Sequence, residues 1–225
     1  MDIDIINHLG EFLTDKRLGL YKKVLSQRTD YTTVVLEDIY QPHNASAVLR
    51  SCDCFGVQQV NIIENRNSYK VNPEVAMGAT KWLDLHYHNQ KDNNTLDTIN
   101  KLKSQGYRII ATTPHSNDVD LADFDVHKGK FALMFGTEHT GLSDIAIENA
   151  DEFLKIPMYG FTESFNISVS AALIMHQLTE KLRNSDIPWQ LSEERYNQLL
   201  FDWLTTTLKR SGKIIEEYKQ RESTL

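Results

Sequence analysis

The sequence predicts an α/β fold in which a mostly parallel sheet is covered by helices, with a helical arm at each end of the chain. Three observations support this class. Short apolar runs recur through the middle of the chain, helical patterns separate most of them, and 225 residues suit one large domain with arms. We therefore predict an N-terminal arm over residues 1–30, a central domain over 31–183 and a C-terminal arm over 184–225.

The central domain contains several apolar runs that have the length of buried strands. The first run, TTVVLEDI, is rich in β-branched residues, which favour strands. The later runs are also too short for an ordinary helix, so we expect a strand in each. The runs occupy residues 32–39, 60–64, 108–113, 131–136 and 153–158.

Helical patterns lie between most of these runs. Residues 44–55 form the first pattern, with Asn44 as a candidate N-cap and Gly56 as the residue that ends the helix. Residues 94–104 and 167–183 form two more. Strands that alternate with helices are typical of a parallel sheet with both faces covered.

Both arms combine helical spacing with basic residues. The first pattern covers 11–28, of which 16–28 contain five basic residues and no acidic one. The second pattern covers 191–210, and Ser192 near its start is a candidate N-cap. Because the net charge is −7, binding of a polyanion would depend on these local clusters, although solvated helix faces would give the same pattern. The second cluster consists of Lys209, Arg210, Lys213, Lys219 and Arg221.

Composition and missing motifs exclude several classes of protein. No apolar run approaches the roughly 20 residues that cross a bilayer, and the first ten residues are acidic rather than basic, so we expect a cytoplasmic protein without a membrane partner. Cys52 and Cys54 are the only cysteines and lack zinc-site spacing. Residues 136–141 have phosphate-loop spacing, but Leu142 stands in place of the lysine. We expect neither an ATPase nor a metal enzyme.

Three segments place polar residues at the ends of apolar elements, where α/β sheets usually hold their sites. The first is PHNASAVLRSCDCFGV at 42–57, which includes Arg50. The second is FGTEHTGLS at 135–143, whose glycines permit a ligand to approach the backbone closely. The third is IPMYGFTESFNISVSAAL at 156–173, where three polar residues precede or begin a helix and capping explains only one of them.

With these three motifs in this order, the chain resembles the TrmH/SpoU family of 2′-O-ribose RNA methyltransferases in the SPOUT superfamily. The resemblance covers roughly residues 31–183, and the flanking helices are similar to those of the tRNA-specific branch. It implies methylation of a tRNA ribose with S-adenosylmethionine (AdoMet), at guanosine 18 of the D-loop. It also implies a C-terminal trefoil knot, which is an exception to the general absence of knots, and a homodimer with each site near the interface.

The resemblance implies roles for individual residues. Arg50 matches the family's catalytic arginine, which is proposed to activate the ribose hydroxyl together with an RNA phosphate. Asn44 would order the helix that presents Arg50, and Glu138 would order the second motif or the arginine. Ser164 and Asn166 would position cofactor and ribose. The residues expected to contact AdoMet are Thr112, Gly136, Ile156 and Phe165.

The tRNA branch also uses arginines of the N-terminal arm. Arg17 matches one such position, whereas Leu20 stands where the next arginine is expected. One alternative is a ribosomal RNA 2′-O-methyltransferase. Such enzymes typically have an N-terminal RNA-binding domain, and the residues before the first strand are too few to form one. The other is a catalytically silent RNA-binding dimer, which the presence of Asn44 and Arg50 together with an intact third motif argues against. Further phosphate contacts are expected from Lys22, Lys23, Arg28, Lys209 and Arg210.

Overall fold

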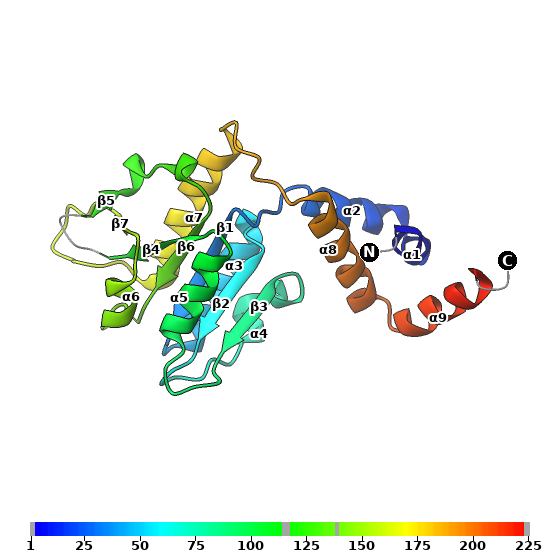
Figure 1. Ribbon diagram of the computed structural model, residues 1–225, viewed down its shortest axis with the longest axis horizontal. Coiled ribbons are helices and arrows are strands. Elements are labelled where there is room, and N and C mark those ends of the chain that lie inside the picture. The colour runs from blue at the N-terminus through cyan, green and yellow to red at the C-terminus, as the bar shows by residue number, and fades with distance from the viewer. Residues whose placement is uncertain (1–2, 114–117, 138–139, 223–225) are drawn as a thin grey trace. The chain divides into compact units, whose positions relative to one another are not determined.

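The computed structural model describes residues 3–113, 118–137 and 140–222 (Figure 1). The chain divides into two compact units. The larger unit comprises residues 29–189, and the smaller one joins the N-terminal segment up to Arg28 with the C-terminal segment from Gln190 onward. The two segments predicted as separate arms therefore pack as a single helical unit.

A parallel sheet of seven strands, with the order β3-β2-β1-β6-β4-β7-β5, forms the centre of the larger unit. The predicted α/β class with a parallel sheet is confirmed. Two strands lie outside the predicted apolar runs: β3 is half-exposed, and β5 is only two residues long. The strands are β1 (Thr32–Glu37), β2 (Gln59–Ile63), β3 (Asp84–His88), β4 (Arg108–Thr112), β5 (Val119–Asp120), β6 (Phe131–Phe135) and β7 (Glu152–Lys155).

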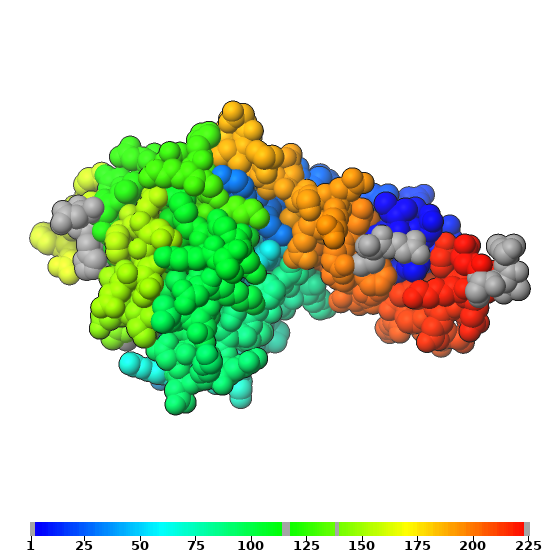
Figure 2. All heavy atoms as spheres, viewed as in Figure 1, coloured from blue at the N-terminus to red at the C-terminus, as the bar shows by residue number. Residues whose placement is uncertain are grey.

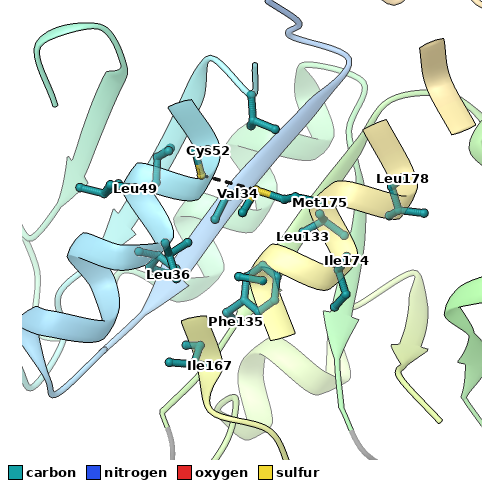
Figure 3. Close-up of a cluster of buried hydrophobic side chains, with 14 of the residues drawn as sticks. Val34, Leu36, Leu49, Cys52, Leu133, Phe135, Ile167, Ile174, Met175 and Leu178 are labelled. Carbon is teal, nitrogen blue, oxygen red and sulfur yellow. Dashed lines mark hydrogen bonds between the residues drawn. The ribbon is translucent and has the colours of Figure 1, made fainter. Parts of the chain in front are cut away.

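Helices cover both faces of this sheet. Alternate residues of β1 belong to different buried clusters, Val34 to one and Val35 to the other, because successive side chains of a strand point to opposite faces. Helices α3 (Pro42–Phe55) and α7 (Ile167–Arg183) pack together over the first cluster, and Figure 3 shows their contact at Cys52 and Met175, whose sulfur atoms lie 3.7 Å apart. Helices α5 (Thr95–Ser104) and α6 (Asp144–Glu148) contribute to the second.

The predicted start of α3 is wrong. The helix begins at Pro42, with Gln41 as its N-cap, so Asn44 lies inside the first turn. Proline favours the first helical position because it has no N–H to leave unpaired there. The C-terminal end is as predicted, since Gly56 has a left-handed conformation with φ 78°.

Short helical segments complete the larger unit: α4 (Pro73–Ala76) and the 3-10 helices Ala79–Lys81, Leu121–Asp123 and Val126–Lys128. Among the described residues, no helix is long and apolar enough to cross a membrane. The same part of the chain contains no group of three or more His, Cys, Asp or Glu side chains that could hold a metal ion.

The helical unit consists of α1 (Ile3–Gly10), α2 (Asp15–Leu25), α8 (Glu193–Thr207) and α9 (Ser211–Glu222). Helix α8 packs against α1, α2 and α9, with Leu199, Leu200, Trp203 and Leu204 buried. The hydroxyl groups of Tyr21 and Thr207 lie 2.6 Å apart and tie the two segments together. The sequence did not predict α1. The helical pattern expected over 191–210 ends at Thr207, and a second helix follows.

Candidate active site

A cavity of about 600 Å³ lies at the carboxyl ends of β4, β6 and β7, beside the N-terminal half of α7. This is the end of a parallel sheet at which ligands usually bind. Its lining is about equally polar and apolar, and it includes the carboxylates of Asp144 and Glu163. Apolar side chains of the lining include Phe135, Leu142, Leu154, Ile156, Ile167 and Ile174.

The four residues expected to contact a cofactor, Thr112, Gly136, Ile156 and Phe165, all line this cavity, and Ser164 lines it too. They come from three segments that are far apart in the sequence. Thr112 is held at the end of β4 because its hydroxyl donates to the carbonyl of Met134, 2.7 Å away. Phe165 is 44 % exposed at the mouth of the cavity.

Gly136 allows the loop after β6 to close on itself. A Cβ atom at this position would lie 2.2 Å from the backbone carbon of Gly141 and 2.3 Å from the backbone nitrogen of Leu142. Thr137 and Gly141 then exchange two backbone hydrogen bonds, of 2.9 and 3.1 Å. Gly141 itself has φ +70°, a conformation that favours glycine. The space beside Gly136 is therefore filled by the backbone of Gly141 and Leu142 rather than by a ligand. The closed loop forms a wall of the cavity.

Asn166 joins the first and third motifs. It is the N-cap of α7, and its side-chain oxygen accepts from the backbone N–H of Ser168 at 2.9 Å. Its side-chain nitrogen donates to Oδ1 of Asn44 at 3.2 Å. Asn44 is 4 % exposed and also donates to Gln41. The Asn44–Asn166 hydrogen bond thus ties the start of α3 to the start of α7.

Arg50 does not line the cavity. Its side chain is exposed on α3, beyond the turn that holds Asn44. The guanidinium is therefore accessible to a large substrate outside the cofactor cavity. Glu138, the remaining expected catalytic residue, lies outside the described residues.

Replacing Asn166 with alanine should remove both the helix cap and the link to Asn44. We expect a loss of about 1 kcal/mol in stability, typical of a lost cap, and weaker AdoMet binding or slower turnover by a folded protein. Asn166→Asp is the matched control, because it keeps the capping oxygen and loses only the amide donor. Unchanged kinetics in Asn166→Ala would show that this link does not support the site.

The expected RNA contacts divide into accessible and buried residues. Arg28 is 1 % exposed, and its guanidinium carbon lies 5.5 Å from the centroid of the Trp203 ring. Its expected role as a phosphate contact is therefore corrected, because a buried guanidinium packed on an aromatic ring cannot reach RNA in this conformation. The accessible residues are Arg17, Lys22, Lys23, Lys209 and Arg210.

Sequence reasoning missed several residues of the site. Thr113, Thr137, Thr140 and Leu142 line the cavity beside the predicted residues. The available signal was the second motif for the last three, and the position next to Thr112 for Thr113. It also missed Glu37, which is 2 % exposed at the end of β1. A carboxylate within an apolar run, TTVVLE, was the signal in this case.

Comparisons with known proteins agree with the resemblance. A sequence profile of the SpoU rRNA Methylase family matches residues 31–176. The chain is 40 % identical over 212 residues to the tRNA (guanosine(18)-2′-O)-methyltransferase of Borreliella burgdorferi, covering 93 % of this chain and 95 % of the relative. It is 31 % identical over 198 residues to the Escherichia coli K12 protein of the same name, covering 84 % of each.

A solved structure is similar over most of the chain. The Aquifex aeolicus TrmH/SpoU tRNA modifying enzyme superposes with a TM-score of 0.76 at 27 % identity, and the match covers 87 % of this chain and 98 % of that one. The similarity therefore extends beyond residues 31–176 into the helical unit.

Proposed function

Since this chain belongs to the SpoU rRNA methylase family, we propose that it transfers a methyl group from AdoMet to the ribose 2′-hydroxyl of guanosine 18 in tRNA. The observation that carries the proposal is the 40 % identity to a tRNA (guanosine(18)-2′-O)-methyltransferase over 93 % of the chain. Such a substrate implies a protein that works in the cytoplasm. The ribosomal RNA alternative is weaker, because the relatives that match nearly full length are named for tRNA.

The residues of the cavity fit AdoMet. A volume of about 600 Å³ falls within the range of pockets that enclose small cofactors, roughly 300–1,000 Å³. Apolar side chains such as Ile156 and Leu154 could pack against an adenine ring, and polar side chains of the lining such as Ser164 could bind polar groups of the cofactor. When bound, AdoMet supplies an electrophilic methyl group on a sulfonium, and this chemistry requires no metal.

The chain's own residues would hold the ribose hydroxyl in line with the methyl group and help to remove the hydroxyl proton. A hydroxyl is a poor nucleophile until it loses its proton, so the site needs a proton acceptor close to it. Free arginine is too basic to be that acceptor. We therefore assign Arg50 to orienting an RNA phosphate beside the hydroxyl. Ser164 on the cavity wall would position the ribose, and Asn166 would hold α3 and α7 together.

We also propose that two chains form a homodimer through α7. Val169 and Leu173 on this helix are 44 % and 43 % exposed, which leaves an apolar stripe on the side away from its buried residues. The trefoil knot is part of the same proposal. It rests on membership of the family whose profile matches residues 31–176.

Basic residues of the helical unit are proposed to bind the phosphates of tRNA. In Figure 2 the surface near the C-terminus, in orange and red, belongs to α8 and α9, and Lys209 and Arg210 lie exposed at the junction of these helices. Lys22 and Lys23 are exposed in the last turn of α2. The overall charge of −7 would repel RNA, so these local clusters must overcome it.

Replacing Lys22, Lys23, Lys209 and Arg210 with glutamate should weaken tRNA binding and leave AdoMet affinity unchanged. Each lost phosphate contact should lower the salt slope of log K by about 0.9 for duplex RNA regions, and by less for single strands. Lys81→Glu with Lys101→Glu is the control, since both lysines are exposed in the larger unit. Unchanged tRNA affinity and salt dependence would place the grip elsewhere, on the face around Arg50.

The proposed substrate class can be tested with purified protein and labelled AdoMet. We expect transfer of label to unmodified tRNA transcripts and none to transcripts of ribosomal RNA domains. The Arg50→Ala protein is the negative control for both substrates. Labelling of ribosomal RNA in place of tRNA would favour the alternative function, and binding of tRNA without any transfer would favour the silent dimer.

A further inference from the structure

We propose that Glu37 is a positioning residue for the cofactor loop, which means the described residues 136–137 and 140–142 after β6, and that AdoMet affinity depends on it. The inference rests on the proposed function, since it assigns the cavity to AdoMet. Glu37 lies at the end of β1 and is 2 % exposed. It does not line the AdoMet cavity, so it would act through its neighbours.

The carboxylate of Glu37 holds the exit of the cofactor loop. Its Oε2 accepts from the backbone N–H of Ser143 at 2.8 Å, and its Oε1 accepts from the Ser143 hydroxyl at 2.7 Å. Ser143 follows the loop directly and is the N-cap of α6, where its hydroxyl accepts from the N–H of Ala146. A single carboxylate therefore fixes both the backbone and the side chain of this residue.

The same carboxylate is anchored on its other side. Oε1 also accepts from the hydroxyl of Thr95 at 2.6 Å, and Thr95 is completely buried at the start of α5. A buried carboxylate is stable only when donors replace its lost water, and these three hydrogen bonds supply them. Glu37 is thus a fixed point to which the exit of the loop is attached.

The entrance of the loop lies beside the same strand. Leu36 pairs with Phe135 in the sheet, so Glu37 and Gly136 are the next residues of two neighbouring strands. Between entrance and exit, the loop is closed by the contact of Gly136 with Gly141 and by the two hydrogen bonds between Thr137 and Gly141. Glu37 consequently lies beside Gly136, where the loop begins, and accepts hydrogen bonds from Ser143, which follows the loop.

This placement matters because the cofactor loop is a shared wall. A second cavity of about 600 Å³ adjoins the first, and residues on and just after the loop line both. A wall between two cavities has open space on both sides, so its position depends on the contacts at its ends. If its exit were released, the wall could move toward the second cavity and lose its fit to AdoMet. The shared residues are Thr137, Thr140, Gly141, Leu142 and Asp144.

Glu37→Gln tests the inference by replacing one of the two carboxylate oxygens with an NH2 group, which donates hydrogen bonds and cannot accept them. We expect the Kd for AdoMet, measured by calorimetry without RNA, to rise at least about tenfold, the size of one lost charge-assisted hydrogen bond. Thr98→Val is the matched control, because it removes a buried hydroxyl of α5 that donates to the carbonyl of Asn94 and leaves the three hydrogen bonds of Glu37 in place. That variant should melt at a lower temperature and keep its AdoMet affinity within about twofold, well below the loss of one such bond.

Ser143→Ala provides a second route if Glu37→Gln does not fold. It removes the hydroxyl donor and the cap of α6, and we expect AdoMet affinity to fall by about threefold or more, since the backbone donor remains. Ser192→Ala removes an equivalent cap from α8 and should leave AdoMet affinity unchanged. Wild-type AdoMet affinity in both Glu37→Gln and Ser143→Ala would overturn this inference and leave the proposed function standing. Failure of the wild-type protein to bind AdoMet would overturn the proposed function and this inference with it.

Discussion

Replacement of Arg50 with alanine should reduce kcat for tRNA methylation by at least about a hundredfold, the lower range for removal of a group that assists proton transfer. Arg50 is exposed on α3 and lies outside the lining of the AdoMet cavity, so its loss should not disturb the cofactor. We therefore expect calorimetry to give an AdoMet affinity within about threefold of the wild-type value, less than the loss of one hydrogen bond.

Arg50→Lys separates charge from geometry. Lysine keeps the positive charge, but it lacks the planar fork that binds a phosphate through two parallel hydrogen bonds. Its turnover should fall between those of the wild-type and alanine proteins. A large loss of AdoMet affinity in Arg50→Ala would contradict the assignment of Arg50 to the RNA side of the reaction.

Replacement of Gly136 with alanine should abolish measurable AdoMet binding. The added Cβ would lie 2.2 Å from the backbone of Gly141, and backbone atoms cannot yield as a flexible side chain can. The loop would have to open and break its two hydrogen bonds between Thr137 and Gly141. We also expect destabilisation of about 1–3 kcal/mol, as for other overpacked sites.

Gly160→Ala is the matched control for this substitution. Gly160 belongs to the third motif, and the nearest atom to its added Cβ is 4.0 Å away, which is an ordinary contact. Its AdoMet affinity and thermal midpoint should remain near the wild-type values. Normal AdoMet binding by Gly136→Ala would show that the closed loop is not needed for the cofactor.

The sequence predicted the parts of the fold that depend on local pattern. The run FALMF is fully buried as β6, and the helix expected over 167–183 has those bounds. Strand β3 lies outside the predicted apolar runs because DLHYH is half-exposed and carries no continuous apolar run. Asn44 was misplaced as an N-cap because Asn is a favoured capping residue, whereas Pro42 determined where the helix starts.

Long-range contacts could not be predicted from the same patterns. The Asn44–Asn166 and Glu37–Ser143 hydrogen bonds join residues more than a hundred positions apart, and only the folded sheet brings them together. The burial of Arg28 likewise depends on Trp203 from the opposite end of the chain. By contrast, the cofactor residues Thr112, Gly136, Ile156 and Phe165 were identified through the resemblance, and their shared cavity supports that assignment.

Mapping of ribose methylation on a single tRNA tests the central claim most directly. The purified protein, AdoMet and an unmodified tRNA transcript should yield one 2′-O-methylguanosine, located by mass spectrometry at position 18. A transcript with 2′-deoxyguanosine at that position should bind the protein but accept no methyl group. Methylation at another nucleotide, or continued transfer to the deoxy-substituted tRNA, would contradict the proposed function.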